Sequence, residues 1–177
     1  MKQASRNLAL CGVLCALAVA IMAMGTILPV ATYCAPVLAS MTLLPVLVLC
    51  GEKLSWAMFF ASAMLSLLLA PDKEAAAIFL ALGYYPIVKP KLDRKPKIRR
   101  WVGKFLLFNV SILAAYAVLL FVLRLDALRE EFSAMSGALL AGLLLGGNFL
   151  FWLDDRLLGR FAPRAAALCA RWEKKHR

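Results

Sequence analysis

The sequence predicts an all-α integral membrane protein with six transmembrane helices and with both chain ends in the cytoplasm. Hydrophobic residues make up 63% of the 177 positions and the mean hydropathy is +0.80, whereas soluble domains are about 45–50% apolar. Several apolar runs approach the roughly 20 residues that a helix needs to cross a bilayer. Basic residues are also distributed very unevenly among the loops between these runs. Helices are expected because open strands leave backbone groups without hydrogen bonds in lipid.

Turn residues separate the apolar runs, and the first run follows a basic start that is typical of a retained signal anchor. Breaks occur at Gly25, Gly51 and Pro71, all residues that favour turns. The six expected spans are residues 8–25, 33–50, 54–70, 75–89, 104–124 and 134–153. They form one membrane domain, residues 1–153, and residues 154–177 form a basic cytoplasmic tail that is either amphipathic or disordered. Pro163 is expected to interrupt a helix in this tail.

The positions of the basic residues determine the predicted orientation. With the N-terminus inside, eighteen of the 21 lysines and arginines lie on the cytoplasmic side and three lie outside. Five of the ten acidic residues fall in the two outer loops. This asymmetry follows the positive-inside rule, and Tyr84 and Tyr85 are expected to anchor the fourth span at the inner interface. We expect the basic loop at residues 89–104 and the tail to contact anionic lipids, not nucleic acid.

The stretch SLLLAPDKEAAAIFL, residues 66–80, places three ionisable side chains between two apolar runs. Only 35 residues separate Lys53 from Lys89, but two spans and a turn need about 40. Either the bilayer thins locally, or the turn ends below the outer surface. Asp72 suits a helix cap and Glu74 complements the positive end of a helix. Capping alone therefore explains both acids, and it is compatible with contact to a ligand.

Further polar and aromatic side chains belong to the same outer half of the predicted bundle. A few directed polar groups beside aromatic faces are typical of a small-molecule pocket. Each side chain taken singly is more typical of an ordinary, satisfied polar group of a membrane protein than of a ligand contact. The candidate substrate-binding residues are Thr32, Tyr33, Ser66, Asp72, Lys73, Glu74, Tyr116 and Ser136.

Two other patterns concern contacts between helices. Gly12, Ala16 and Ala20 recur at four-residue spacing on the first span, and such stripes let helix backbones approach closely. The stripe serves either packing within the chain or docking of another membrane subunit, and spacing alone does not separate these roles. Asn109 and Asn148 map to the cytoplasmic half of the fifth and sixth spans, where we expect a hydrogen bond between them.

Residues for metal or nucleophilic chemistry are scarce. The five cysteines form no CxxC pair, and the single histidine, His176, lies in the tail. Structural and catalytic transition-metal sites need clustered Cys and His ligands. We therefore expect neither a metal site, nor a cofactor, nor catalytic residues.

Taken together, these features resemble the substrate-binding S-components of energy-coupling factor transporters. The matching features are the basic start MKQASRN, the Gly12, Ala16 and Ala20 stripe in GVLCALAVA, and the polar residues near the outer loops. The resemblance implies the S-component fold, docking of the stripe on a transmembrane coupling subunit, and a vitamin or related micronutrient bound under the outer loops. It further implies uptake powered by a partner ATPase pair and a multi-pass location in a bacterial inner membrane. The absence of a GxxxxGK[ST] nucleotide loop fits this division of labour.

Two rival function classes stay open on the sequence. A membrane-embedded enzyme could use Asp72 and Glu74 as an acid–base pair, but carboxylates two residues apart at a helix start point in different directions. A non-transporting membrane assembly protein would use the outer charges only for structure. Copurification with a coupling subunit and an ATPase pair distinguishes the transporter from both.

Overall fold

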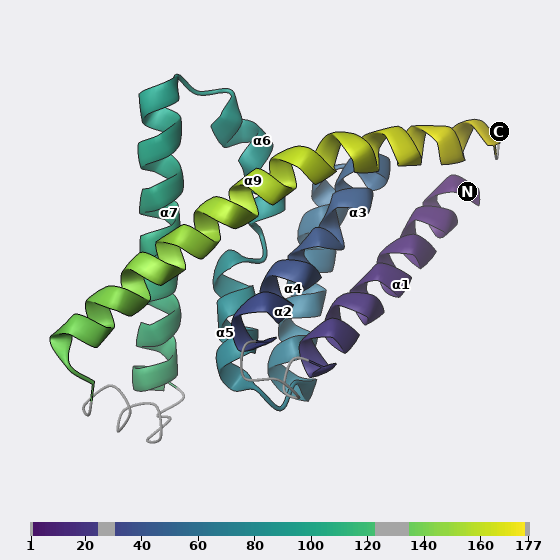
Figure 1. Cartoon of the computed structure of the whole chain (residues 1–177). Coiled ribbons are helices and arrows are strands. Elements are labelled where there is room, and N and C mark those ends of the chain that lie inside the picture. Colours follow the sequence, from purple (N-terminus) through teal and green to yellow (C-terminus); the bar gives the residue numbers. More distant parts are fainter. Residues whose placement is uncertain (1, 25–30, 123–134, 176–177) are drawn as a thin grey trace.

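The computed structural model describes residues 2–24, 31–122 and 135–175, and the regular elements within these ranges are all helical. In chain order they are α1 (Lys2–Met24), α2 (Ala31–Met41), α3 (Leu43–Cys50), α4 (Glu52–Leu69), α5 (Lys73–Leu82), α6 (Tyr85–Asp93), α7 (Lys97–Ala117), the π-helical η2 (Val118–Val122) and α9 (Gly137–Lys175). Figure 1 shows their arrangement in a bundle.

Five stretches of this bundle are long and apolar enough to cross a membrane. They cover Ala4–Met24, Thr32–Cys50, Glu52–Leu69, Lys97–Leu120 and Gly137–Cys169. The second stretch consists of α2 and α3. The predicted break after it is confirmed at Gly51, which adopts a φ of 83°, a left-handed conformation that glycine takes without strain. The chain is therefore a helical multi-pass membrane protein, as its composition predicts.

The predicted fourth span differs from a single helix. Residues 75–89 are divided between α5 and α6, which have 10 and 9 residues, each too short to cross a bilayer alone. The chain turns at Gly83, where an added Cβ would come within 2.5 Å of the carbonyl oxygen of Phe79. Pro86 then lies in the first turn of α6, where its missing N–H leaves no hydrogen bond unmade.

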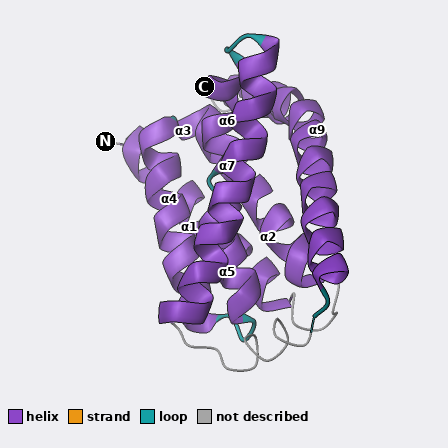
Figure 2. Cartoon of the chain, turned by 90° about the vertical axis from the view of Figure 1, so that its left-hand side faces the viewer, coloured by secondary structure: helices purple, strands orange, loops and turns teal. Residues whose placement is uncertain are grey.

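The helical segments run alternately between the two ends of the bundle (Figure 1). The turn between α4 and α5 lies at one end, which we call the α4–α5 end. The α6–α7 turn lies at the other, the α6–α7 end, together with the start of α1 and the end of α9 (Figures 1 and 2). One apolar core joins α1 to α5 around Phe79, and a second joins α3, α6, α7 and α9 around Phe108 and Phe151.

The expected interruption of the tail at Pro163 is wrong. Helix α9 runs for 39 residues through Pro163, and at 1.5 Å per residue it is about 58 Å long, well beyond a hydrocarbon core of about 30 Å. Pro163 and the preceding turn at Gly159 are exposed, so the carbonyl that loses its helical partner can bond outside the helix. The second half of α9 lies across the α6–α7 end (Figure 1), and Asp154 and Leu158 are buried there.

Candidate functional site

The side chain of Asp72 caps helix α5, as the sequence predicts. Its Oδ1 accepts a hydrogen bond from the backbone N–H of Ala75 at 3.0 Å, which satisfies one of the free donors at the helix start. The other oxygen, Oδ2, accepts a hydrogen bond from the hydroxyl of Thr32 at 2.8 Å. Asp72 thereby connects the start of α5 to the start of α2.

Lys73 folds back onto the end of α4. Its Nζ donates to the carbonyl oxygens of Leu67 at 2.8 Å and Ala70 at 3.0 Å. These carbonyls belong to the last turn of a helix, where acceptors lack partners within the helix. Lys73 therefore stabilises the α4–α5 turn. Its ammonium group is occupied by backbone carbonyls and, unlike Asp72 and Glu74, does not join the predicted ligand-binding residues.

Glu74 accepts hydrogen bonds from tyrosines on two other helices. Its Oε1 accepts a hydrogen bond from the hydroxyl of Tyr116 on α7 at 2.8 Å and a longer one from Tyr33 on α2 at 3.4 Å. Glu74 and Tyr116 are half-buried, whereas Tyr33 is 42% exposed. Together with Thr32 and Asp72, these three residues form a polar group that we call the Glu74 cluster.

Two predicted members, Ser66 and Ser136, make no hydrogen bond to this cluster among the described residues. Ser66 on α4 is fully buried and its hydroxyl has no hydrogen-bond partner in the described part of the chain. Ser136 is exposed and caps α9, with its hydroxyl accepting from the N–H of Leu139 at 3.4 Å. Five of the eight candidate residues thus take part in the Glu74 cluster through two sets of hydrogen bonds, one between Thr32 and Asp72 and one from Tyr33 and Tyr116 to Glu74.

The Glu74 cluster contains two carboxylates, those of Asp72 and Glu74. Within residues 2–24, 31–122 and 135–175 no ion pair reaches Asp72 or Glu74, and the donors to both carboxylates are neutral hydroxyl and backbone groups. The two acids bind different partners, which weakens the acid–base pair interpretation. The cluster can instead accept hydrogen bonds from a ligand, with the tyrosine rings as flat contact surfaces.

The small-residue stripe on α1 faces away from the protein. Gly12, Ala16 and Ala20 are all exposed, and a Cβ added to Gly12 would meet no atom of the described residues within 4 Å. The buried side of α1 is formed by other residues, among them Ala18 and Met22. Packing within the chain therefore does not explain the stripe, and docking of another subunit stays a prediction.

The predicted hydrogen bond between Asn109 and Asn148 is confirmed. The amide of Asn109 donates to the Asn148 side-chain oxygen at 3.0 Å, and Asn148 donates back at 3.3 Å. Each amide also donates to the carbonyl four residues earlier in its own helix, on Phe105 or Leu144, at 2.8 Å. This pair satisfies both amides and joins α7 to α9.

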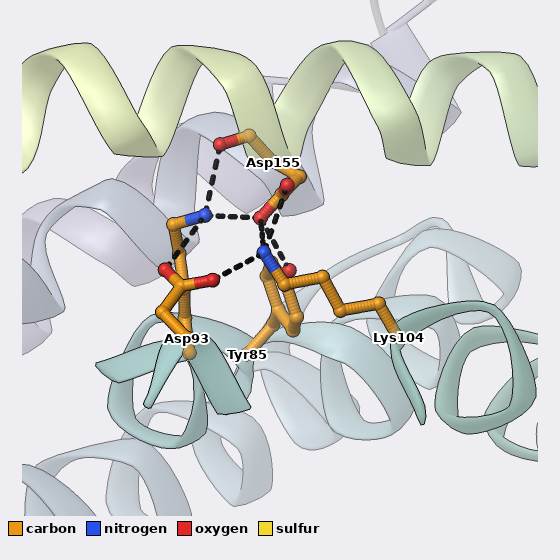
Figure 3. Close-up of polar contacts among 5 residues, drawn as sticks. Tyr85, Asp93, Lys104 and Asp155 are labelled. Carbon is orange, nitrogen blue, oxygen red and sulfur yellow. Dashed lines mark hydrogen bonds and ion pairs between the residues drawn. The ribbon is translucent and has the colours of Figure 1, made fainter. Parts of the chain in front are cut away.

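A second polar group, near the α6–α7 end, was not expected from the sequence. Asp155 on α9 is its centre (Figure 3), and it binds Lys89 of α6 and Lys104 of α7. Lys104 Nζ lies 2.8 and 2.9 Å from the two carboxylate oxygens. The hydroxyl of Tyr85 donates to Asp155 Oδ1 at 2.6 Å. Asp93 of α6 completes this Asp155 network, with distances of 2.6 Å to Lys104 and 3.4 Å to Lys89.

Sequence reasoning placed the members of this network in unrelated roles. Lys89 and Lys104 counted as basic loop residues, Tyr85 as an interface anchor and Asp155 as part of the tail. Their actual environment is internal, since both lysines are buried. The i, i+4 spacing of Lys89 and Asp93 was the one local signal of an ion pair.

Comparison with known proteins does not indicate a function, so the geometry of the sites described above is the main guide. No family model, curated protein or solved structure matches this chain significantly. The Glu74 cluster, the outward stripe of α1 and the Asp155 network must therefore be interpreted from their own chemistry.

Proposed function

We propose that this protein is the substrate-binding membrane subunit of an uptake system, of the kind represented by the S-components of energy-coupling factor transporters. It would bind a vitamin or related micronutrient at the Glu74 cluster and work with a separate coupling subunit and ATPases. Six membrane segments, both chain ends in the cytoplasm and a bacterial inner membrane are parts of this proposal. The shared position of both chain ends and the basic α6–α7 turn at one end of the bundle supports this orientation.

The convergence of two tyrosines on Glu74 is the observation that carries the proposal. Three residues from α2, α5 and α7 meet although 41 and 42 residues separate the tyrosines from Glu74 in the chain. Helix capping explains Asp72 but not this contact, because neither tyrosine serves the start of α5. Convergent polar groups with aromatic faces are typical of small-molecule sites.

The exposed face of α1 supports the existence of a membrane partner. Side chains at Gly12, Ala16 and Ala20 are too small to cover the helix backbone, so another helix can approach closely there. The hydrophobic residues between them, such as Val13 and Leu17, are also exposed. The face thus has the size and composition for helix–helix contact in lipid.

The ligand-binding part is tested by mass spectrometry of small molecules retained by the purified protein. Wild-type protein should retain a small molecule, and Glu74→Gln should lose most of it because the amide cannot replace both the charge and the acceptor. Glu52→Gln is the matched control: this exposed carboxylate lies at the other end of α4 and pairs with Lys91. Equal retention by folded Glu74→Gln and wild-type protein would refute the assignment of the site.

The docking part is tested by copurification from the native host membrane. Ala16→Leu should reduce the yield of associated coupling subunit and ATPases, since the larger side chain prevents close backbone approach. Ala114→Leu makes the same enlargement at an exposed position of α7 and should leave the complex intact. A complex that survives Ala16→Leu in full would exclude the stripe as the docking surface.

A further inference from the structure

Asp154 is a buried acid that neither the fold nor the proposed function uses. Its side chain is 9% exposed, and its Oδ1 has no hydrogen-bond donor among the residues that the structure describes. Burying an ionised carboxylate without a partner is very costly, and such groups neutralise instead. Asp154 therefore needs a bound cation or a proton.

The groups around Asp154 leave no lysine available to it. Helix α6 contributes Lys89, and α7 contributes Lys104, but within the described residues the ion pairs of both lysines go to Asp155 and Asp93. Helix α3, which also packs against α9, has no charged residue. Tyr85 on α6 is bound to Asp155, and Arg156 of α9 lies over the ring of Trp152.

Charge balance favours a proton over a metal ion. Two lysines and two aspartates make the Asp155 network neutral, and an ionised Asp154 would add an unbalanced negative charge. Among the described residues there is no group of three Cys, His, Asp or Glu side chains arranged to hold a metal. A proton on Asp154 restores neutrality without any further ligand.

We propose that Asp154 is a proton-binding site whose occupancy controls how firmly α9 is held against α6 and α7. With the proton bound, Asp155 and Asp93 engage the two lysines without competition from Asp154. When the proton leaves, the new carboxylate beside Asp155 repels it and competes for Lys89. Elsewhere the contact between α7 and α9 consists mainly of the asparagine pair and the stacked rings of Phe108 and Phe151. The Asp155 network therefore supplies an important part of the attachment of α9 to α7.

The stability of the full chain in detergent, measured as its unfolding temperature from pH 5 to pH 8, tests this control. The unfolded chain releases the Asp154 proton in the ordinary carboxyl range, near pH 4, whereas the folded chain keeps it. The stability that the Asp154 proton contributes is then fully present below that pH range and is lost as the pH rises. The unfolding temperature should fall by up to roughly 3–5 °C per pH unit for one proton. Asp154→Asn should remove this part of the slope, and Glu52→Gln should retain it.

Infrared spectroscopy detects the proton itself. Folded protein carrying isotopically labelled aspartate should show the carbonyl stretch of a protonated carboxylic acid, which disappears at high pH and is absent from Asp154→Asn. If the asparagine variant does not fold, Asp154→Glu removes the labelled group and keeps an acid in place. The proposal is overturned if the band is missing above pH 5, if it persists in these variants, or if the folded Asp154→Asn protein retains the wild-type pH slope.

Discussion

Replacing Asp155 should destabilise this protein more than replacing any exposed acid. The Asp155→Asn substitution keeps the size of the side chain and removes its charge. It leaves the side chains of Lys89 and Lys104, which are only 10% and 8% exposed, with Asp93 as their remaining anion. Asp93 is 38% exposed, so it is less able to balance two buried positive charges.

The expected magnitude follows from this burial. Removing one partner of a buried ion pair costs about 3–5 kcal/mol because the other charge stays buried and unpaired. Since Asp93 persists and asparagine can still accept a hydrogen bond, we expect the lower end, about 3 kcal/mol. For a chain of this size that corresponds to a fall of roughly 6–12 °C in the unfolding temperature, measurable by circular dichroism in detergent micelles.

Glu52→Gln is the matched control for this measurement. It breaks the ion pair between Glu52 and Lys91, whose side chains are 43% and 62% exposed, and exposed pairs contribute at most about 1 kcal/mol. Repeating Asp155→Asn in an Asp154→Asn background removes the neighbouring acid as a substitute partner. Equal shifts for Asp155→Asn and Glu52→Gln in both backgrounds would refute the reasoning that the Asp155 network is an internal ion-pair group.

Three further predictions concern the helix contacts and the topology. A double-mutant cycle of Asn109→Leu and Asn148→Leu should give a coupling free energy of about 0.6–1.7 kcal/mol, the range of interhelical hydrogen bonds in membranes, and zero coupling would contradict the pairing. Gly83→Ala should cost about 1–3 kcal/mol in unfolding free energy because the methyl group meets Phe79, as in overpacked cores, whereas Gly142→Ala has open space and should be neutral or stabilising. Single cysteines in the α4–α5 and α6–α7 turns of a chain freed of its own cysteines should react with an impermeant thiol reagent from opposite sides of the membrane; labelling from one side would reject the proposed topology.

Much of the fold could be predicted because hydropathy and charge are local properties of the chain. Five of the six expected spans correspond to helices long enough to cross a membrane, and Gly51 ends α3 as expected. The break at Gly83 was missed because apolar composition continues through it, and only the packing against Phe79 shows that a side chain does not fit there. The uninterrupted course of α9 was missed because a single proline was given more weight than the helical residues on both sides of it.

The candidate site was predicted in part for a similar reason. The capping role of Asp72 depends on the residues next to it in the chain, so the sequence was sufficient. The contact of Tyr33 and Tyr116 with Glu74 was predicted only as a set of polar residues at one end of the bundle. The sequence did not specify which of these residues form hydrogen bonds with one another. Lys73 and Ser136 were included for their position, although their side chains serve helix ends.

By itself, the sequence determined that this is a multi-pass helical membrane protein, where its apolar segments lie, and how its charges are divided between the loops. Those properties follow from the free energy of placing each side chain in lipid or water, which depends on that residue and its near neighbours. The tertiary structure alone decided that Tyr116 meets Glu74 and that Asp155 holds two lysines 66 and 51 residues away in the chain. Such contacts depend on how separate helices pack, because that packing determines which oppositely charged group lies close enough to pair with a buried charge.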